Sequence, residues 1–285
     1  MSGVIHIGLS GWSYRDWHDD FYPADLSKHD ELWYASRQFP TLEINRTFYS
    51  LASGEIFRTW HETTPARFKF AVKGSRFITH NKKLRETAEP LANFMGSGIL
   101  ELKDKLGPIL WQLGPRLRFS SERMDRFLSL LPKDSGQVAA MAGVSSPTAR
   151  GPGENHRVRH VVEPRHESFF VPGMVRLARE HRVALAFSHS SQWPYTEEIT
   201  SGFVYLRLHG PGALYSSAYS DAELGGWASR IRAWSSGSEP EDARRITDLE
   251  PPRRKRRDVY VYFDNDAGGH APRQARSLTK MVDGR

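Results

Sequence analysis

The pattern of a buried strand is clearest in the segment Phe203-Val204-Tyr205-Leu206-Arg207-Leu208-His209. Its aliphatic side chains alternate with Tyr205, Arg207 and His209, and this period of two predicts a β-strand. The strands of a parallel sheet are normally apolar on both faces, and a buried charge is costly. We therefore expect Arg207 to lie near the open carboxyl end of its strand.

Seven other segments have the length and apolar content of strands. They are Val4–Leu9, Thr41–Asn45, Phe68–Lys73, Ile109–Leu113, Val158–Glu163, Val183–Phe187 and Val259–Phe263. Helical periodicity or helix-start signals occur between most of them, around Glu31–Phe39, Ser120–Leu131 (Ser120 as N-cap) and Pro172–His181. Strands that alternate with helices predict βα units, and eight of them fit a single (β/α)₈ TIM barrel of about 250 residues. A doubly wound open sheet is the alternative, but no G-x-G-x-x-G turn follows the first strand.

The composition indicates a globular chain without cysteine chemistry. Of its 285 residues, 39% are hydrophobic and 26% are charged, which is enough for a sizeable core. The absence of cysteine excludes disulfides, thiolate metal sites and cysteine nucleophiles, and it favours a cytoplasmic location. We expect neither a signal peptide nor a membrane helix, which needs ~18 apolar residues in a row.

The positive charge is concentrated in one run. The net charge is +7, and Arg253-Arg254-Lys255-Arg256-Arg257 contributes five positive side chains. A nucleic-acid surface would spread basic residues over a face and interleave aromatic side chains with them. We interpret the run as a solvated loop inside an irregular insertion at about residues 235–257. A second irregular insertion is expected at about residues 136–155, and the barrel domain at about residues 4–280.

The period of two also places the polar residues of the strand ends on one face. The inner face of the barrel is expected to carry three acids and three bases: Glu43, Glu163, Asp264, Lys73, Arg165 and Arg207. Barrel proteins place their ligand sites at this carboxyl end, so the cluster predicts a site there. The alternative is a structural ion-pair network that plugs the mouth, because buried charges must pair whether or not they catalyse.

Several strings at the strand ends occur together and in order. They include Ser10-Gly11-Trp12-Ser13-Tyr14, Glu43-Ile44-Asn45-Arg46-Thr47-Phe48-Tyr49, Glu163-Pro164-Arg165-His166, Tyr205-Leu206-Arg207-Leu208-His209-Gly210 and Tyr262-Phe263-Asp264-Asn265-Asp266. In these strings the chain resembles the DUF72 family, also called the YecE-like proteins, which implies a TIM-barrel-like fold. The resemblance implies no reaction, because the family is named for having none assigned. The chain departs from the family pattern at His189, where many relatives have aspartate, and at Gln274, where asparagine is common.

The residue types at the mouth suit recognition of an anion best. Arg165 and Arg207 offer bidentate contacts to phosphate or carboxylate, and Lys73 adds a point charge. The candidate catalytic residues are Glu43, Glu163 and His166. The candidate ligand-binding residues are Trp12, Tyr14, Asn45, Lys73, His80, Gln112, Arg165, Arg207, His209, Asp264 and Asn265. The favoured hypothesis is a phosphorylated or nucleotide- or sugar-like anionic ligand, with hydrolase or lyase chemistry as the associated reaction class.

Other chemistries stay open as alternatives. A glycosidase-like enzyme would use Glu43 and Glu163 as its two carboxylates. A non-catalytic protein that binds a small ligand or nucleic acid would have the same pocket without turnover. A metal site is disfavoured because Lys73, Arg165 and Arg207 would repel a cation, and no cofactor is expected, since no P-loop is present.

Overall fold

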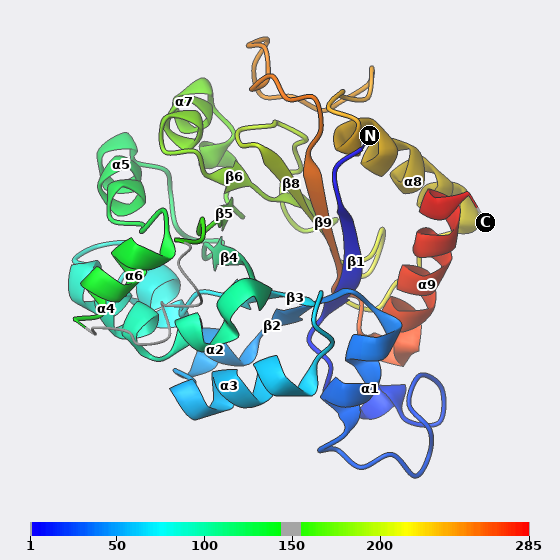
Figure 1. The fold of residues 1–285 in the computed structure, drawn as a ribbon. Helices are drawn as coiled ribbons and strands as arrows, with labels where there is room; N and C mark the ends of the chain where they lie inside the picture. The colour runs from blue at the N-terminus through cyan, green and yellow to red at the C-terminus, as the bar shows by residue number, and fades with distance from the viewer. Residues whose placement is uncertain (1, 144–154, 285) are drawn as a thin grey trace.

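The computed structural model describes residues 2–143 and 155–284, and these form a ring of parallel strands surrounded by helices (Figure 1). The strands are β1 (Ile5–Ser10), β2 (Thr41–Ile44), β3 (Lys69–Lys73), β4 (Leu106–Gln112), β5 (His160–Glu163), β6 (Ala184–Leu185), β7 (Phe187–His189), β8 (Phe203–Leu208) and β9 (Asp258–Phe263). All pair in parallel with their neighbours. The TIM-barrel-like fold expected from the strand count is confirmed.

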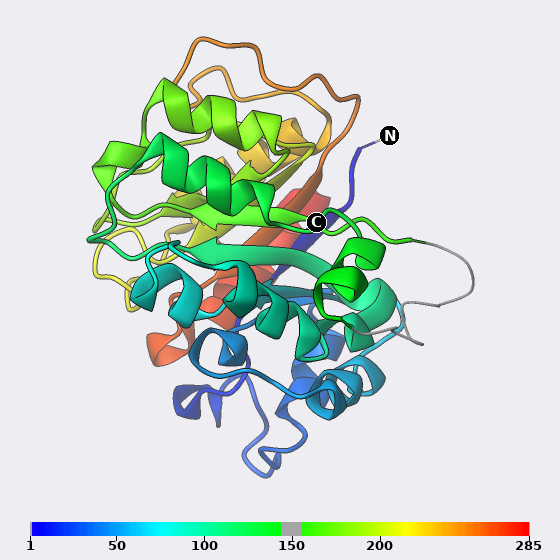
Figure 2. The same ribbon diagram turned by 90° about the vertical axis from the view of Figure 1, so that its left-hand side faces the viewer.

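The helices lie outside the strands. They are α1 (Glu31–Gln38), α2 (Arg46–Tyr49), α3 (Gly54–Thr63), α4 (Ala88–Gly96), α5 (Ser121–Ser129), α6 (Ser135–Met141), α7 (Pro172–Glu180), α8 (Asp221–Ser235) and α9 (His270–Asp283). Short helical turns are η1 (Arg15–Trp17), η2 (Phe77–Asn81), η3 (Ile99–Lys105), η4 (Glu167–Phe169) and η5 (Ala267–Gly269). Figure 2 shows α5 and α7 lying over the outer face of the strands. None of the helices in these described ranges is long and apolar enough to cross a membrane.

One interrupted strand brings the two edges of the sheet together. The spatial order of the strands is β6-β5-β4-β3-β2-β1-β9-β8-β7, so β6 and β7 lie at opposite edges although only Ala186 separates them in the chain. The Ala186 amide still donates to the Val162 carbonyl at 2.9 Å. The sequence predicted one strand here, at Val183–Phe187. It divides because its first part pairs with β5 and its second part with β8.

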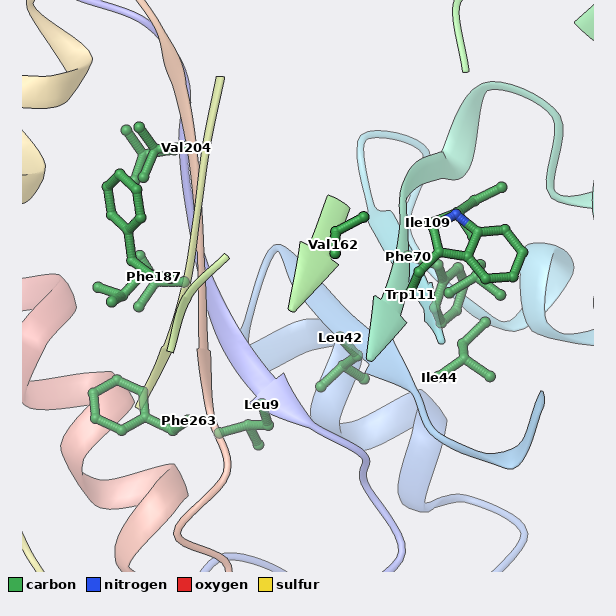
Figure 3. Packing of buried hydrophobic residues seen from close by; sticks show 14 of the residues in the cluster. Leu9, Leu42, Ile44, Phe70, Ile109, Trp111, Val162, Phe187, Val204 and Phe263 are labelled. Carbon is green, nitrogen blue, oxygen red and sulfur yellow. The ribbon is translucent and has the colours of Figure 1, made fainter. Parts of the chain in front are cut away.

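The strands pack into two separate apolar cores, one on each side of the sheet. Outward-facing side chains such as Leu42, Phe70 and Val162 pack beneath the helices (Figure 3). A smaller cluster fills the barrel interior and includes Ala71, Leu110, Val161, Tyr205 and Tyr262. The strands are therefore buried on both sides, and polar inward-facing residues are left mainly at the two ends of the barrel.

The two segments expected to be irregular insertions differ in their secondary structure. The first was expected to lack regular structure from about residue 136, but α6 occupies its beginning, with Asp134 as N-cap accepting from the Gln137 amide at 2.9 Å. Residues 144–154 of this insertion lie outside the described residues. Residues 236–257 of the second contain neither helix nor strand. The N-cap expected at Ser120 is present, since its hydroxyl accepts from the Arg123 amide.

The close approach of β1 and β2 generates a test of the fold. A Cβ at Gly8 would lie 1.9 Å from the Thr41 carbonyl oxygen, a backbone atom that cannot move without breaking the sheet. We expect Gly8→Ala to lower the free energy of unfolding by at least about 1–3 kcal/mol.

The matched control is Gly225→Ala in α8, where a Cβ meets nothing within 4 Å. It should raise the free energy of unfolding by about 0.5–1 kcal/mol, because alanine is the better helix former. Urea unfolding of both variants measures this, and equal effects would contradict the register of β1 against β2.

Candidate functional site

The guanidinium of Arg207 lies at the centre of the barrel mouth and binds three carboxylates. Its Nη2 donates to Glu43 Oε1 at 2.8 Å and to Asp264 Oδ2 at 3.0 Å. Its Nη1 donates to Glu163 Oε2 at 3.0 Å, and its Nε to Glu43 Oε2 at 3.1 Å. Arg207, Glu43 and Glu163 are completely buried. Arg207 and the three carboxylates that it binds are therefore four of the six charged residues expected on the inner face.

Glu43 is held at both of its carboxylate oxygens. The Ser10 hydroxyl donates to Oε1 at 2.6 Å, and the Tyr205 hydroxyl donates to Oε2 at 2.6 Å. Ser10 also accepts from Asn45 Nδ2 at 3.1 Å and from Arg207 Nη2 at 3.0 Å. With these partners and no exposed surface, Glu43 organises the mouth rather than facing a ligand.

Arg165 is also occupied by protein groups. Its Nε and Nη2 donate to Glu163 Oε1 at 3.1 and 3.0 Å, and Nη2 also donates to Gln112 Oε1 at 3.1 Å. Its guanidinium lies 3.9 Å from the centroid of the Trp193 ring. The Trp193 indole donates to Ser188, which donates to Glu163 Oε1 at 2.8 Å. The bidentate anion contacts expected of Arg165 and Arg207 are thus made with carboxylates of the chain itself.

His209 connects the two sides of this network. Its Nδ1 lies 2.8 Å from Asp264 Oδ2, and its Nε2 lies 3.1 Å from the Ser188 hydroxyl and 3.5 Å from Glu163 Oε1. The imidazole is completely buried. His209 is therefore a member of the ion network. The sequence predicts this, because residues two apart in a strand point to the same face and His209 follows Arg207 by two.

The guanidinium groups keep the neighbouring carboxyl groups ionised. Burial by itself raises the pKa of Glu163, but Arg165 and Arg207 outweigh burial and hold that pKa well below its ordinary value. Burial is likewise outweighed at Asp264, where Arg207 and His209 lower the pKa. A carboxyl group that stays ionised at neutral pH has no proton to donate, so Glu163 does not fit the role of a general acid.

A cavity of about 690 Å³ opens beside the network at the carboxyl end of the barrel. Its walls come from the segment after β1, from the β2–α2 junction, from the end of β3 and from the segment after β9. Among the residues that line it are Trp12, Tyr14, Asn45, Lys73, Asp264 and Asp266. Five of these six belong to the set of ligand-binding residues predicted from the sequence.

Lys73 is the base that the ion network leaves out. Its side chain makes no hydrogen bond and no ion pair with any part of the chain that the structure describes, although the residue is only 9% exposed. The ammonium lies 4.7 Å from the centroid of the Phe48 ring. Burial and the positive charge of Arg207 lower the pKa of Lys73. The cavity thus has a poorly solvated amine in its wall.

Two more polar groups of the cavity wall lack partners. The Oδ1 atoms of Asp266 and Asn45 are buried and accept no hydrogen bond from residues 2–143 or 155–284. Burial and the negative charge of Asp264 raise the pKa of Asp266 well above the ordinary carboxyl range. A buried polar atom without a partner is costly, so a ligand that binds these groups gains affinity.

Three predicted site residues belong neither to the cavity lining nor to the ion network around Arg207. His166 caps η4, where its Nδ1 accepts from the Ser168 amide at 3.2 Å. Asn265 donates to the Ser217 carbonyl at 3.0 Å and so supports the segment after β9. His80 lies in the π-helical turn η2 and packs its ring edge against Phe48. The interpretation of His166 as a catalytic residue gains no support from this position.

The two departures from the family pattern meet at one tyrosine. His189 Nδ1 lies 2.9 Å from the Tyr219 hydroxyl. Gln274 donates to the Tyr219 carbonyl at 2.7 Å and accepts from Asn265 at 2.8 Å. Both side chains therefore support the loop that precedes α8.

Sequence reasoning missed several members of the site. They include Ser10, Ser188 and Asp266, which face the barrel interior or its mouth. Their places at or just after the ends of predicted strands are the signal that could have identified them. Trp193 and Tyr215, which contact Arg165, lie in loops, where no period assigns a face. Within the described residues, no group of three or more His, Asp or Glu side chains is placed to hold a metal ion.

The fold and this mouth define a TIM-barrel-like protein with a candidate ligand site at the carboxyl end of its strands. The chain belongs to the DUF72 family: the family model described as "Protein of unknown function DUF72" matches residues 6–285. The protein YunF of Bacillus subtilis (strain 168) is 20% identical over 298 residues, which cover 98% of this chain and 95% of that protein. The protein YecE of Escherichia coli (strain K12) is 31% identical over 115 residues, 37% of this chain and 40% of that protein.

Solved structures of the same family share the fold. The crystal structure of a DUF72 family protein from Thermotoga maritima MSB8 matches with a TM-score of 0.73 at 22% identity, covering 98% of this chain and 99% of that chain. A DUF72 family protein from Enterococcus faecalis V583 matches with a TM-score of 0.71 at 17% identity, covering 98% and 96%. At these identities the likeness establishes the barrel and says nothing of a substrate.

The carboxylate cluster generates a prediction about pH. In the wild type, Glu163 and Asp264 have depressed pKa values, so their stabilisation is fully present above the unfolded-state pKa of about 4 and is lost as the pH falls further. Arg207→Met leaves buried carboxylates without their cation and should cost about 3–5 kcal/mol at pH 8. Burial then raises the carboxyl pKa values, so the variant should gain stability as the pH falls from 8 to 5, whereas the wild type should not.

Urea unfolding at pH 5 and pH 8 measures this difference. The control is Arg126→Met, which removes an exposed ion pair with Glu122 on α5 and should change little at either pH. A variant of Arg207 with the pH profile of the wild type would show that the cluster does not depend on that cation.

Proposed function

We propose that the protein binds a small sugar-like anion, such as a sugar phosphate or a nucleotide, in the cavity at the barrel mouth. The observation that carries this proposal is the nearly buried ammonium of Lys73, which lines the cavity without a partner among the described residues. An unpaired buried charge is destabilising, and an anion that binds it relieves that cost.

The other charges of the cavity wall support an anionic ligand. Lys28 and Arg46 also line the cavity and are exposed, and neither makes an ion pair within the described ranges. Among the acidic groups of the wall, Asp264 binds Arg207, Glu31 lies 3.0 Å from His18 Nε2, and burial and the charge of Asp264 raise the pKa of Asp266. The positive charges are therefore available to a ligand.

The uncharged part of the wall supports a ligand that carries hydroxyl groups. The side-chain amide of Asn45 and the carboxyl group of Asp266 line the cavity and can bind hydroxyl groups of a sugar. The rings of Trp12, Tyr14 and Tyr49 line the same cavity and offer flat apolar surfaces for a sugar or a base. An inorganic anion would leave these groups unused.

The cavity also contains an acid and a base with opposite pKa shifts. Asp266 keeps its proton at higher pH than an ordinary carboxyl group, and Lys73 loses its proton at lower pH than an ordinary amine. A carboxyl group whose pKa is raised can serve as a general acid at neutral pH. We propose hydrolase or lyase chemistry with Asp266 as proton donor, while Lys73, Arg46 and Lys28 hold the anionic group.

The glycosidase-like alternative has less support. It requires Glu43 and Glu163 to flank a sugar, with one of them protonated. Both are completely buried and bind the same guanidinium, and the pKa of Glu163 is lowered rather than raised. Asp266, by contrast, has a raised pKa, as a general acid requires.

A thermal-shift screen tests the proposed ligand class. The panel holds inorganic phosphate, sugar phosphates, nucleotides and neutral sugars, and a ligand at 100 times its dissociation constant stabilises a protein by about 2.7 kcal/mol. We expect a sugar phosphate or nucleotide to stabilise the wild type and to lose that effect in Lys73→Met, which keeps the side-chain volume and removes the charge. The matched control is Lys280→Met on α9, an exposed lysine outside both cavities. Equal stabilisation of the wild type and of Lys73→Met, or stabilisation by neutral sugars alone, would contradict the proposal.

A further inference from the structure

A second cavity lies at the opposite, amino-terminal end of the barrel. It has a volume of about 480 Å³ and is lined by the beginnings of β1, β3, β4, β5 and β9 and by η3. TIM barrels place their reaction sites at the other end, so this cavity is not part of the site described above. Its residues were not singled out by the sequence analysis.

The side chains of this cavity carry a positive excess. The bases that line it are Arg67, Lys69, Lys103, Arg157 and Arg159, and the acids are Asp104 and Asp258. Five positive charges against two negative charges leave a net charge of +3 before any histidine is protonated.

One of the two acids already binds a cation: Asp258 accepts from Arg159 at 2.8 Å. Asp104 lies 3.6 Å from the His61 imidazole, whose pKa is lowered by burial. By contrast, Arg67, Lys103 and Arg157 make no ion pair with residues 2–143 or 155–284. Burial and the charges of Arg159, Arg182 and Arg254 lower the pKa of Arg157. The electrostatic potential around Arg157 is therefore positive, because the neighbouring positive charges are not balanced by acidic side chains.

The floor of the cavity presents a neutral imidazole that lacks a partner. His6 is only 8% exposed, and its Nδ1 is buried without a hydrogen bond to any described residue. Its ring stacks on Tyr260 with 4.7 Å between centroids. Burial lowers the pKa of His6 to about 4, so the ring is neutral at physiological pH and has one N–H to donate. This is a second feature, independent of the basic side chains, that fits a ligand with acceptor oxygens.

We propose that the amino-terminal cavity is a binding site for a compact ligand that carries two or more phosphate groups. Arg67, Lys103 and Arg157 surround it from three different segments, so a single phosphate cannot neutralise them all. The walls converge on a concave space, whereas a nucleic-acid surface would extend along a face. This site is separate from the mouth, so it stands whether or not the proposed function does.

Calorimetric titration with inorganic pyrophosphate tests the proposal. We expect the double variant Arg157→Ala/Lys103→Ala to bind pyrophosphate at least about tenfold more weakly than the wild type, because it loses two cations that can make charge-assisted hydrogen bonds to the phosphates. Both side chains are exposed and make no hydrogen bonds through their charged groups within the described ranges, so the fold should be kept; circular dichroism checks it. In His6→Phe, which keeps the stacking on Tyr260, binding should also weaken.

The matched control lies outside both cavities: Arg126→Ala on α5 removes an exposed cation and should leave the pyrophosphate affinity unchanged. The mouth variants Arg46→Ala and Lys73→Met test whether pyrophosphate binds at the mouth instead. Unchanged affinity in the double variant, or an equal loss in the mouth variants, would overturn the proposal. Tighter binding of a single-stranded oligonucleotide than of pyrophosphate, lost on replacing Arg253 and Arg254, would assign the charge to an extended nucleic-acid surface and would also overturn it.

Discussion

The organisation of the barrel mouth depends on one buried cation. Arg207 extends from β8 into the barrel and binds carboxylates from β2, from β5 and from the end of β9. These carboxylates come from strands that are not all neighbours in the sheet, so the guanidinium links opposite sides of the ring. A buried carboxylate without this cation would pay its desolvation penalty unopposed. The upper layer of the barrel interior is therefore closed by charge pairing, while the layer below it is closed by apolar packing.

This pairing determines which groups are available for a ligand. Two interpretations of the six charged residues were open, a structural plug and a ligand site, and the structure supports a division between them. Arg207 and Arg165 neutralise carboxylates of the chain, and these residues form the plug. Lys73 stays outside it and lines the cavity with Asp266 and Asn45. Burial raises the pKa of Asp266, and the ionised Asp264, a member of the plug, raises it further.

The sequence predicted the fold and the composition of the mouth, but not its pairing. The period of two placed Glu43, Glu163, Arg207 and Asp264 on the inner face, because a strand offers a side chain only two directions. It did not indicate which base would stay unpaired, since that depends on lateral distances between strands that are far apart in the chain. The division of the sixth strand at Ala186 arises from pairing with two different neighbours, which no local pattern encodes. Trp193, which lies in a loop, was missed for the same reason.

The central claim is that the ion network leaves the amine of Lys73 poorly solvated and available to an anionic ligand. Nuclear magnetic resonance of protein labelled with ¹³Cε-lysine measures it directly, by titrating the Lys73 signal with pH in the free protein and with a bound sugar phosphate. The account predicts a pKa below the ordinary lysine value of about 10.4 in the free protein, and a rise when the anion binds. An ordinary pKa in the free protein that does not respond to the ligand would contradict it.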